Sequence, residues 1–285
     1  ATDRGIRVMP EFDTPGHTLS WGFGQPGLLT PCYSDGQPNG NYGPVDPTQE
    51  ANYQFLKELF TEVMKLFPDH FLHLGGDEVP FGCWESNPDV MAFINDNNLV
   101  DARGLENYYF SKLLPIVSGL PTNNGYIVWE EVFNNNVALA NDTIVHIWKS
   151  EDNPTEFNKE IERVTAAGYQ ALLSSCWYLN YISYGEDWHK YYECDPQGFN
   201  GTAEQKKLMI GGEACVWGEF IDRTNIITIS WPRGSVVAER LWSDAEQTSN
   251  TDLAGPRLEE QRRRMYNRGH MAAPLNPSYC MADLD

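Results

Sequence analysis

The sequence predicts an α/β fold of the (β/α)8-barrel type, in which parallel strands alternate with helices. Six short apolar runs recur along the 285 residues, each ends in polar or aromatic residues, and helix-like stretches lie between them. Such alternation is typical of parallel sheets with crossover helices, and in a barrel the active site forms where the strands end. A doubly wound sheet is the alternative, but no run is followed by a GxGxxG or P-loop turn.

Each predicted strand leads into a tail of residues that can carry chemistry. The six strands are, in chain order, Ile6–Phe12, Phe71–Leu74, Tyr126–Val128, Thr143–Ile147, Gln170–Leu173 and Leu208–Ile210. Their tails are residues 13–17, 75–78, 129–131, 148, 174–180 and 211–213. Because the carboxyl ends of parallel barrel strands meet at one face, we expect these tails to build one site.

Four helices are predicted from the spacing of apolar side chains. In the first, Phe55, Leu59, Val63 and Leu66 recur at i, i+4, i+8 and i+11, which predicts one buried helix face. Glycines at 168 and 269 stand where a left-handed residue commonly ends a helix. The predicted helices are Glu50–Leu66, Gly104–Ser118, Thr155–Ala167 and Pro256–Arg268.

The acidic composition excludes two classes of function. Twenty Lys and Arg stand against 40 Asp and Glu, which gives a net charge of −20. Nucleic-acid-binding proteins carry basic patches, and membrane-surface proteins carry polybasic segments. The apolar runs are also far shorter than the ~18–20 residues that span a bilayer. We therefore expect no nucleic-acid partner and no membrane span.

Cysteines and glycosylation sequons indicate an oxidising compartment. The chain has six cysteines, none of them in a CxxC pair, which disfavours a zinc ribbon or a thioredoxin-like motif. Asn141 and Asn200 each begin an Asn-x-Thr sequon. Together with the acidity, these features favour a secreted or lysosomal protein.

The clearest catalytic signal is the phrase from His73 to Glu78, in which two glycines precede Asp77 and Glu78. Adjacent residues of a regular strand point to opposite faces, so both carboxylates can serve one pocket only where the strand ends or bulges. Their mutual charge and partial burial would raise the pKa of one of them, which gives an acid beside a carboxylate. An ordinary solvated pair of carboxylates is the alternative.

Tryptophans form the second signal. Four of them fall at or just beyond predicted strand ends: Trp129, Trp148, Trp177 and Trp217. A single such residue would indicate core packing. Four at one end of successive strands indicate a pocket with flat apolar walls, which suits the C–H faces of sugar rings.

The phrase from Asp13 to His17 leaves several interpretations open. Asp-Thr-Gly would indicate an aspartic protease, but Pro15 interrupts the triplet and no second copy exists. A metal site of His17, His73 and Asp77 is a weak alternative, because no HExxH motif accompanies it. A serine hydrolase with a catalytic triad is disfavoured, because the sequence has no GxSxG motif.

At these residues the chain resembles the β-N-acetylhexosaminidases of glycoside hydrolase family 20, of the eukaryotic lysosomal or secreted type. The matching phrases follow the same order nearly end to end: RVMPEFDTPGHTLSW from Arg7, FLHLGGDEV from Phe71, residues 128–133, WYLN from Trp177, IGGEACVWGE from Ile210 and AERLWS from Ala238. The resemblance implies a retaining exo-glycosidase that removes terminal β-linked N-acetylhexosamine, with neither a cofactor nor a metal. A non-catalytic carbohydrate-binding protein is the alternative. A chitinase-like enzyme is remote, because no DxxDxDxE phrase occurs.

The resemblance assigns roles in substrate-assisted catalysis, an exception to the two-carboxylate scheme. Glu78 would be the general acid and base, and Asp77 would hold the N–H of the substrate's 2-acetamido group. Tyr178 would donate to the acetamido oxygen. His17 would lie near the acid, with Asp13 beside it in the strand-end loop. The other implied substrate contacts are Trp129, Trp148, Trp177, Asn180, Trp217 and Glu219.

The resemblance also implies how the chain is organised. Residues 1–285 would form strands three to eight of the barrel, without the first two strands, their sugar-binding arginine, or the accessory domain that precedes the barrel. The intact enzyme would be a homodimer or heterodimer, and the missing N-terminal segment could itself be a partner. Cys32–Cys83 and Cys176–Cys194 would be disulfides, with Cys215 and Cys280 left as thiols. Family members that accept 6-sulfated substrates carry an arginine where this chain has Tyr181.

Overall fold

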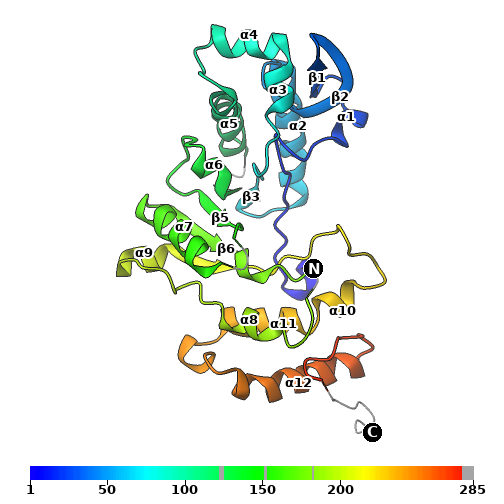
Figure 1. Ribbon diagram of the computed structural model, residues 1–285, viewed down its shortest axis with the longest axis vertical. Coiled ribbons are helices and arrows are strands. Elements are labelled where there is room, and N and C mark those ends of the chain that lie inside the picture. Colours follow the sequence, from blue (N-terminus) through cyan, green and yellow to red (C-terminus); the bar gives the residue numbers. More distant parts are fainter. Residues whose placement is uncertain (122–124, 151–152, 182, 278–285) are drawn as a thin grey trace. The chain divides into compact units, whose positions relative to one another are not determined.

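Parallel strands followed by helices recur in the computed structural model of the chain (Figure 1). The structure describes residues 1–285 except 122–124, 151–152, 182 and 278–285. The chain divides into two units, Ala1–His146 and Ile147–Asp285. No helix within the described ranges is long and apolar enough to cross a membrane.

The first unit contains three parallel strands, a hairpin and several helices. In chain order its elements are η1 (Thr2–Arg4), α1 (Trp21–Gly24), β1 (Leu29–Ser34), β2 (Gln37–Val45), α2 (Glu50–Leu66), β3 (Phe71–His73), α3 (Gly82–Ser86), α4 (Pro88–Asp96), α5 (Ala102–Ser118), β4 (Gly125–Trp129), α6 (Glu130–Asn134) and β5 (Ile144–Ile147), which ends at the unit boundary.

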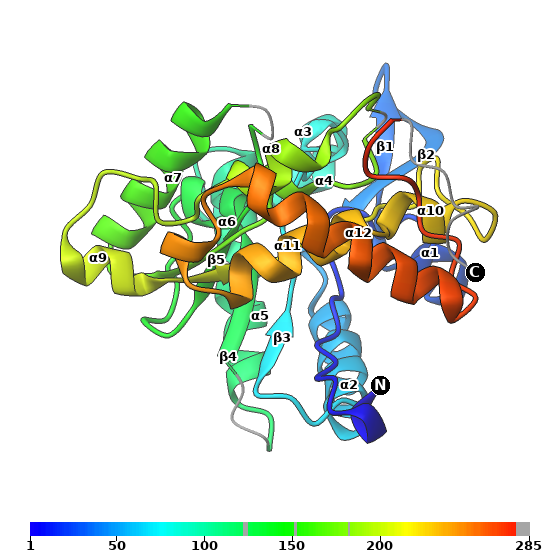
Figure 2. The ribbon, with the colours of Figure 1, turned by 90° about the horizontal axis from the view of Figure 1, so that it is seen from below.

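The parallel strands of the first unit are in a register that brings their carboxyl ends together. His73 of β3 pairs with Ile127 of β4, and Trp129 at the end of β4 pairs with His146 of β5. Figure 2 shows β3 and β4 side by side. The side chains of β4 and β5 are all buried, as the near-continuous apolar runs predict for a parallel sheet covered by helices. Three of the six predicted strands are therefore confirmed here.

The predicted strand Ile6–Phe12 is present only as an extended segment beside β3. Its β-pairing is a single bridge between Glu11 and His73. The backbone of 10–14 nevertheless follows β3 through three bonds, in which His73 N–H donates to Pro10 O (3.1 Å), Phe12 N–H to His73 O (3.0 Å) and Thr14 N–H to Leu74 O (3.2 Å). Pro10 has no N–H to give, which limits the ladder. The prediction of a regular strand is wrong, but the segment delivers Asp13 to the end of β3.

Helix α2 has the predicted bounds but a different buried face. The side chains that it buries are Asn52, Tyr53, Leu56, Phe60, Val63 and Met64. Leu66, which the spacing places on the core face, is mostly exposed, and Phe55 is only partly buried. The core of this unit is formed by that face together with apolar residues of α5 and of β3 and β4.

The hairpin β1–β2 was not predicted. Its strands pair antiparallel from Leu29 and Val45 to Ser34 and Gln37, and the two connecting residues, Asp35 and Gly36, both have positive φ. Asp-Gly in that conformation is the preferred two-residue hairpin connection. The Cys32–Cys83 disulfide joins β1 to α3, which confirms the first implied bridge.

The second unit contains two parallel strands and the described helices from α7 to α12. Its elements are α7 (Pro154–Ala166), β6 (Gln170–Leu173), η2 (Ser175–Trp177), α8 (Trp188–Glu193), α9 (Ala203–Leu208), β7 (Met209–Gly212), α10 (Ile226–Ser230), α11 (Arg233–Trp242), η3 (Ala245–Gln247) and α12 (Thr251–Asn267). Strands β6 and β7 pair in parallel, Ala171 with Met209 and Leu173 with Gly212, which confirms two more predicted strands. Gly168 and Gly269 have the positive φ expected after α7 and α12.

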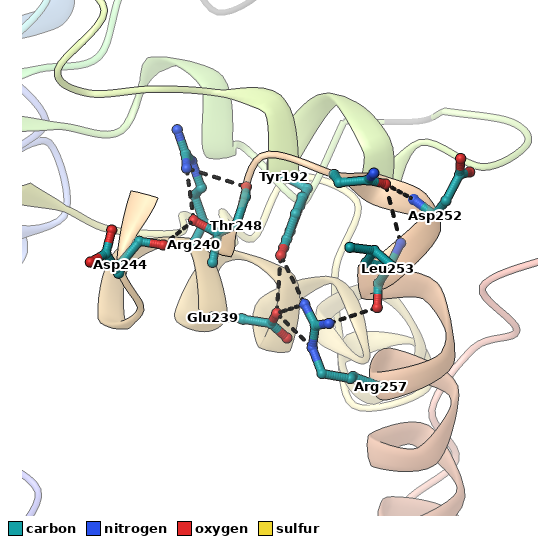
Figure 3. A network of polar contacts seen from close by, with 9 residues as sticks. Tyr192, Glu239, Arg240, Asp244, Thr248, Asp252, Leu253 and Arg257 are labelled. Atoms are coloured by element: carbon teal, nitrogen blue, oxygen red, sulfur yellow. Dashed lines mark hydrogen bonds and ion pairs between the residues drawn. The ribbon is translucent and has the colours of Figure 1, made fainter. Parts of the chain in front are cut away.

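Polar contacts join three helices of the second unit (Figure 3). The Tyr192 hydroxyl of α8 donates to Glu239 Oε1 of α11 at 3.0 Å, and Arg257 of α12 donates to both residues. Arg240 of α11 donates to the carbonyl of Cys194 (2.9 Å) and to Thr248 Oγ1 (2.9 Å). The network joins α11 to α8 and α12, which also contact each other.

The structure describes the remaining cysteines except Cys280, and it describes the asparagines of both sequons. Cys176 and Cys194 form the second implied disulfide, and Cys215 is a buried thiol. Cys280 lies outside the described residues. Asn141 and Asn200 are both exposed, as glycosylation acceptors must be.

Candidate active site

The tail of β3 is a turn that requires its two glycines. Gly75, Gly76 and Glu78 have φ values of 69°, 97° and 48°. A β-carbon on Gly75 would lie 1.8 Å from Asp13 Oδ1, and one on Gly76 would lie 2.3 Å from Val132 Cγ2. Side chains thus cannot occupy either position, and the left-handed backbone ends the strand. This turn brings Asp77 and Glu78 to the same side as Asp13.

Four titratable side chains meet at this turn. His17 Nε2 lies 3.4 Å from Asp77 Oδ2, 3.5 Å from Glu78 Oε2 and 4.0 Å from Asp13 Oδ2. Their exposure differs, because 58% of the Glu78 side chain is accessible but only 16% of the Asp77 side chain. The structure therefore brings together the three catalytic candidates of the first unit, Asp77, Glu78 and His17, and the predicted substrate-binding residue Asp13.

The carboxyl with a strongly raised pKa is Asp13. Burial, followed by the charge of Asp77, raises the pKa of Asp13 to about 9. The Gly76 N–H donates to Asp13 Oδ1 at 2.9 Å, which opposes the rise only in part. We expected the raised pKa within the Asp77–Glu78 pair, but the sequence did not reveal that a third carboxyl reaches the turn. Burial and the charge of Asp77 therefore favour the neutral form of Asp13.

A pocket of about 530 Å³ opens beside these carboxyls. It is lined by polar residues of the 11–17 segment and by apolar residues of α1 and α2, among them Glu11, Phe12, Asp13, His17, Trp21, Phe55 and Leu59. An aromatic and aliphatic wall opposite a few acidic groups is the composition that suits a sugar ring.

Asp13, His17 and Asp77 could also hold a metal ion. Their ligand atoms all lie within 4.8 Å of one another. The metal site considered from the sequence included His73 instead of Asp13, and that combination is wrong. His73 Nε2 lies 3.2 Å from His146 Nδ1, and its Nδ1 accepts from the Gly75 N–H, so the ring is bound elsewhere.

Trp129 occupies the end of β4, as predicted, and belongs to an aromatic cluster. Its ring stacks on His146 with centroids 4.1 Å apart, and the His73 centroid is 4.7 Å away. Its indole N–H donates to Glu11 Oε1 at 2.9 Å. The sequence analysis did not select Glu11 or His146, although each stands one residue before the end of a predicted strand, which was the available signal.

The second unit gathers a different set of candidates around Tyr178. The Tyr178 ring lies 6.3 Å from that of Trp148 and stacks on Tyr181 with centroids 5.4 Å apart. The backbone on either side of Tyr178 is tied to Cys215, since Leu179 N–H donates to the Cys215 carbonyl and Cys215 N–H to that of Trp177. Burial raises the pKa of the Tyr178 phenol, so its hydroxyl remains a proton donor.

The other candidates of this unit differ in exposure. Asn180 Oδ1 is buried and accepts no hydrogen bond from the described residues, which leaves it available for a ligand donor. Trp217 is 39% exposed and Glu219 is exposed, so both can reach a ligand. Trp177 is fully buried, and its indole N–H donates to the Tyr191 carbonyl at 2.9 Å. The Trp177 indole is therefore held within the core of this unit.

Comparison with known proteins identifies the family. The model described as "Glycosyl hydrolase family 20, catalytic domain" matches residues 1–245. The chain is 50% identical over 282 residues to beta-hexosaminidase subunit alpha of Rattus norvegicus, covering 99% of this chain and 53% of that protein. It is 51% identical over 278 residues to the Homo sapiens subunit beta, covering 97% and 49%. The chain thus spans about half the length of the curated relatives that it matches.

Solved structures agree. Flavobacterium johnsoniae chitobiase matches with a TM-score of 0.81 and 30% identity, covering 94% of this chain and 40% of that chain. A Vibrio harveyi GH20 exo beta-N-acetylglucosaminidase in complex with N-acetylglucosamine matches with a TM-score of 0.81 and 22% identity, covering 96% and 44%, which supports the fold alone. The predicted fold class is confirmed, and the chain belongs to glycosyl hydrolase family 20, within the catalytic domain of that family.

Proposed function

We propose that the protein containing this chain is a β-N-acetylhexosaminidase, which hydrolyses terminal non-reducing β-linked N-acetylglucosamine or N-acetylgalactosamine with retention. The observation that carries the proposal is the glycine turn on which Asp77 and Glu78 converge beside His17. Relatives at about 50% identity that bear the name beta-hexosaminidase support the same activity.

Glu78 is the proposed proton donor. Its accessible carboxyl can approach a glycosidic oxygen, while the 2-acetamido oxygen of the same sugar attacks the anomeric carbon. The bond to the leaving oxygen breaks as Glu78 gives up its proton, and a cyclic oxazolinium ion remains. Glu78 then removes a proton from a water molecule, and the oxygen of that water bonds to the anomeric carbon. The bond between this carbon and the acetamido oxygen breaks at the same time, which opens the ring and restores the acetamido group. Two inversions give net retention.

Asp77 is the proposed partner of the acetamido N–H. Its Oδ1 is buried and accepts no hydrogen bond from any described residue, so an N–H of the substrate would satisfy it. A carboxylate at that position also stabilises the positive charge that develops on the oxazolinium ring. Burial and the charge of Asp77 favour the neutral form of Asp13, which would avoid the repulsion of a second negative charge beside Asp77.

The remaining substrate contacts that we propose are mostly residues of the second unit. The Tyr178 hydroxyl would donate to the acetamido oxygen, and Trp148 and Trp217 of this unit, together with Trp129 of the first unit, would wall the sugar. Asn180 and Glu219 would bind the hydroxyl groups. Stacked aromatic rings around Tyr178 and the unsatisfied Asn180 Oδ1 support this assignment.

The organisation of the whole protein is also a proposal. Residues 1–285 would supply strands three to eight of the barrel, and the remainder of the protein would supply the first two strands and an accessory domain. Relatives named as alpha and beta subunits support a dimer. Two disulfides and two exposed sequons support a lysosomal or secreted location.

A chromogenic N-acetyl-β-glucosaminide tests the activity. We expect the full-length protein to hydrolyse it and the Glu78→Gln variant to lose most of that activity. Glu58→Gln, an exposed change on α2, is the matched control and should behave as wild type. A folded full-length protein that binds N-acetylglucosamine without turnover would instead establish the non-catalytic alternative.

A further inference from the structure

Three polar side chains of the first unit contact the indole of Trp129. Trp129 is 2% exposed and ends β4. His146 stacks on its ring with an interplanar angle of 26°, and His73 is tilted by 55° against it. Glu11 Oε1 accepts the indole N–H at 2.9 Å. One carboxylate and two imidazoles therefore surround a ring that lies next to the catalytic turn.

The two imidazoles form a neutral hydrogen-bonded pair. The Gly75 N–H donates to His73 Nδ1 at 3.1 Å, so the His73 proton is on Nε2. That nitrogen lies 3.2 Å from His146 Nδ1, which acts as the acceptor. Both rings are buried, and burial lowers the pKa of each, that of His73 to about 3. The pair thus connects the turn of Gly75 to the ring stacked on Trp129.

Glu11 is the charged member of the arrangement. It stands on the extended segment beside β3, where its backbone bridges to His73. Its Oε1 lies 3.5 Å from His73 Nδ1 and also lines the 530 Å³ pocket. A hydrogen bond from an indole to a carboxylate is stronger than one between neutral groups, and it fixes the rotation of the ring about its side-chain bonds.

We infer that Glu11 is a positioning residue, which with the His73–His146 pair fixes the plane of Trp129 relative to the catalytic turn. The consequence for catalysis rests on the proposed function, because Trp129 is there a wall of the sugar pocket. Glu11 acts through Trp129 and does not transfer a proton itself. Loss of the Glu11 carboxyl should therefore weaken binding of the transition state. This weakening should occur only when residue 129 has an indole N–H for Glu11 to bind.

A double-mutant cycle in the full-length protein tests this dependence. We expect Glu11→Ala to lower kcat/KM for the chromogenic N-acetylglucosaminide about tenfold to a hundredfold, the scale of one charge-assisted hydrogen bond. Glu11→Gln keeps an acceptor oxygen and should lose less than about fivefold. In a Trp129→Phe background, which has no N–H, Glu11→Ala should cost less than about threefold. Equal losses in both backgrounds would overturn the inference.

Indole resonances supply a readout that does not depend on activity. The Trp129 N–H signal, assigned in ¹⁵N-labelled protein by its disappearance in Trp129→Phe, should be protected from exchange. We expect it to shift and lose protection in Glu11→Ala, to shift less in Glu11→Gln, and to stay unchanged in Glu58→Gln. A Trp129 signal that does not respond to Glu11→Ala overturns the positioning role. If the wild type is inactive while this signal responds, the proposed function fails and the positioning role stands.

Discussion

Asp13 Oδ1 occupies the space in which any side chain of residue 75 would begin. A β-carbon on Gly75 would lie 1.8 Å from that oxygen and 2.5 Å from the Asp13 Cα. The two residues are 62 positions apart, yet neither can change without the other, because the Asp13 carboxyl also accepts the N–H of Gly76. The close approach links the segment beside β3 to the turn that carries Asp77 and Glu78.

Gly75→Ala should therefore destabilise the protein and abolish its activity. An alanine at a φ of 69° and in contact with Asp13 costs about 2–5 kcal/mol of unfolding free energy, from backbone strain and overpacking combined. Gly82→Ala is the control, because no atom lies within 4 Å of its added β-carbon. Denaturant unfolding measures both, and similar midpoints for the two variants would contradict the prediction.

Glu78→Gln should impair poor leaving groups more than good ones. General acid catalysis contributes ~10²–10⁴-fold, so an alkyl or sugar leaving group should lose at least that factor in kcat. A nitrophenolate leaves without full protonation and should lose less. Steady-state rates on two substrates of different leaving-group pKa measure the difference. Equal losses on both would show that Glu78 is not the acid.

Glu106 should make the protein more stable in acid. Its carboxyl is fully buried on α5, accepts from Asn135 Nδ2 at 2.7 Å, and has its pKa raised to about 7, chiefly by burial. The folded state thus favours the protonated form. Protonated Glu106 therefore stabilises the folded state relative to the unfolded state. This stabilisation is complete below the ordinary pKa near 4.5, is lost as the pH rises through 7, and amounts to about 3 kcal/mol of unfolding free energy.

Glu106→Gln checks this prediction, because it keeps a neutral group of similar shape. The difference in unfolding free energy between pH 4.5 and pH 7.5 should shrink by about 3 kcal/mol in this variant. Glu58→Gln should keep the wild-type difference. The pKa of Asp13 is raised from 3.8 to about 9, so Asp13 lowers the stability in the same direction throughout this pH range. Wild type and Glu106→Gln share that contribution, so the difference between them reports Glu106.

The two disulfides should contribute unequally to stability. Cys32–Cys83 encloses a sequence separation of 51 residues and Cys176–Cys194 one of 18. Loop-closure entropy gives about 4 kcal/mol for the longer loop and about 3 kcal/mol for the shorter. Paired Cys→Ala variants, compared by denaturant unfolding, should follow that order. The reverse order would mean that the constrained segments keep structure when unfolded.

How far the sequence predicts the fold depends on which interactions decide each element. Helix α2 begins and ends as predicted, because apolar spacing and flanking residues are local signals. Its buried face is set by what lies opposite, so Leu66 is exposed against expectation. The hairpin was missed although Asp35-Gly36 is a strong turn signal, because its strand β2 is largely polar and exposed.

In the candidate site, too, the features that depend on neighbouring residues could be predicted, and those that depend on distant residues could not. Asp77 and Glu78 are visible in the sequence, because two glycines and two carboxylates directly follow an apolar run. The raised pKa of Asp13 is not, because it arises from Asp77, 64 positions away, and from burial that only the fold creates. Glu11 and His146 were missed for the same reason, since their partners are distant in sequence.

Tyr181 should restrict the enzyme to neutral sugars, if the proposed function holds. Its ring stacks on Tyr178 and is 36% exposed, so it offers a phenol where a sulfated substrate would need a cation. Desolvating a sulfate without a charged partner is unfavourable, so we expect kcat/KM for the 6-sulfated glucosaminide to be at least ~100-fold below that for the neutral one.

Tyr181→Arg should narrow this ratio of kcat/KM values about tenfold, because a guanidinium can bind the sulfate through paired N–H groups. Tyr184→Arg adds the same charge at a fully exposed position three residues on and should leave the ratio nearly unchanged. If both variants narrowed the ratio equally, the general charge of the acidic surface, and not the residue stacked on Tyr178, would control the preference.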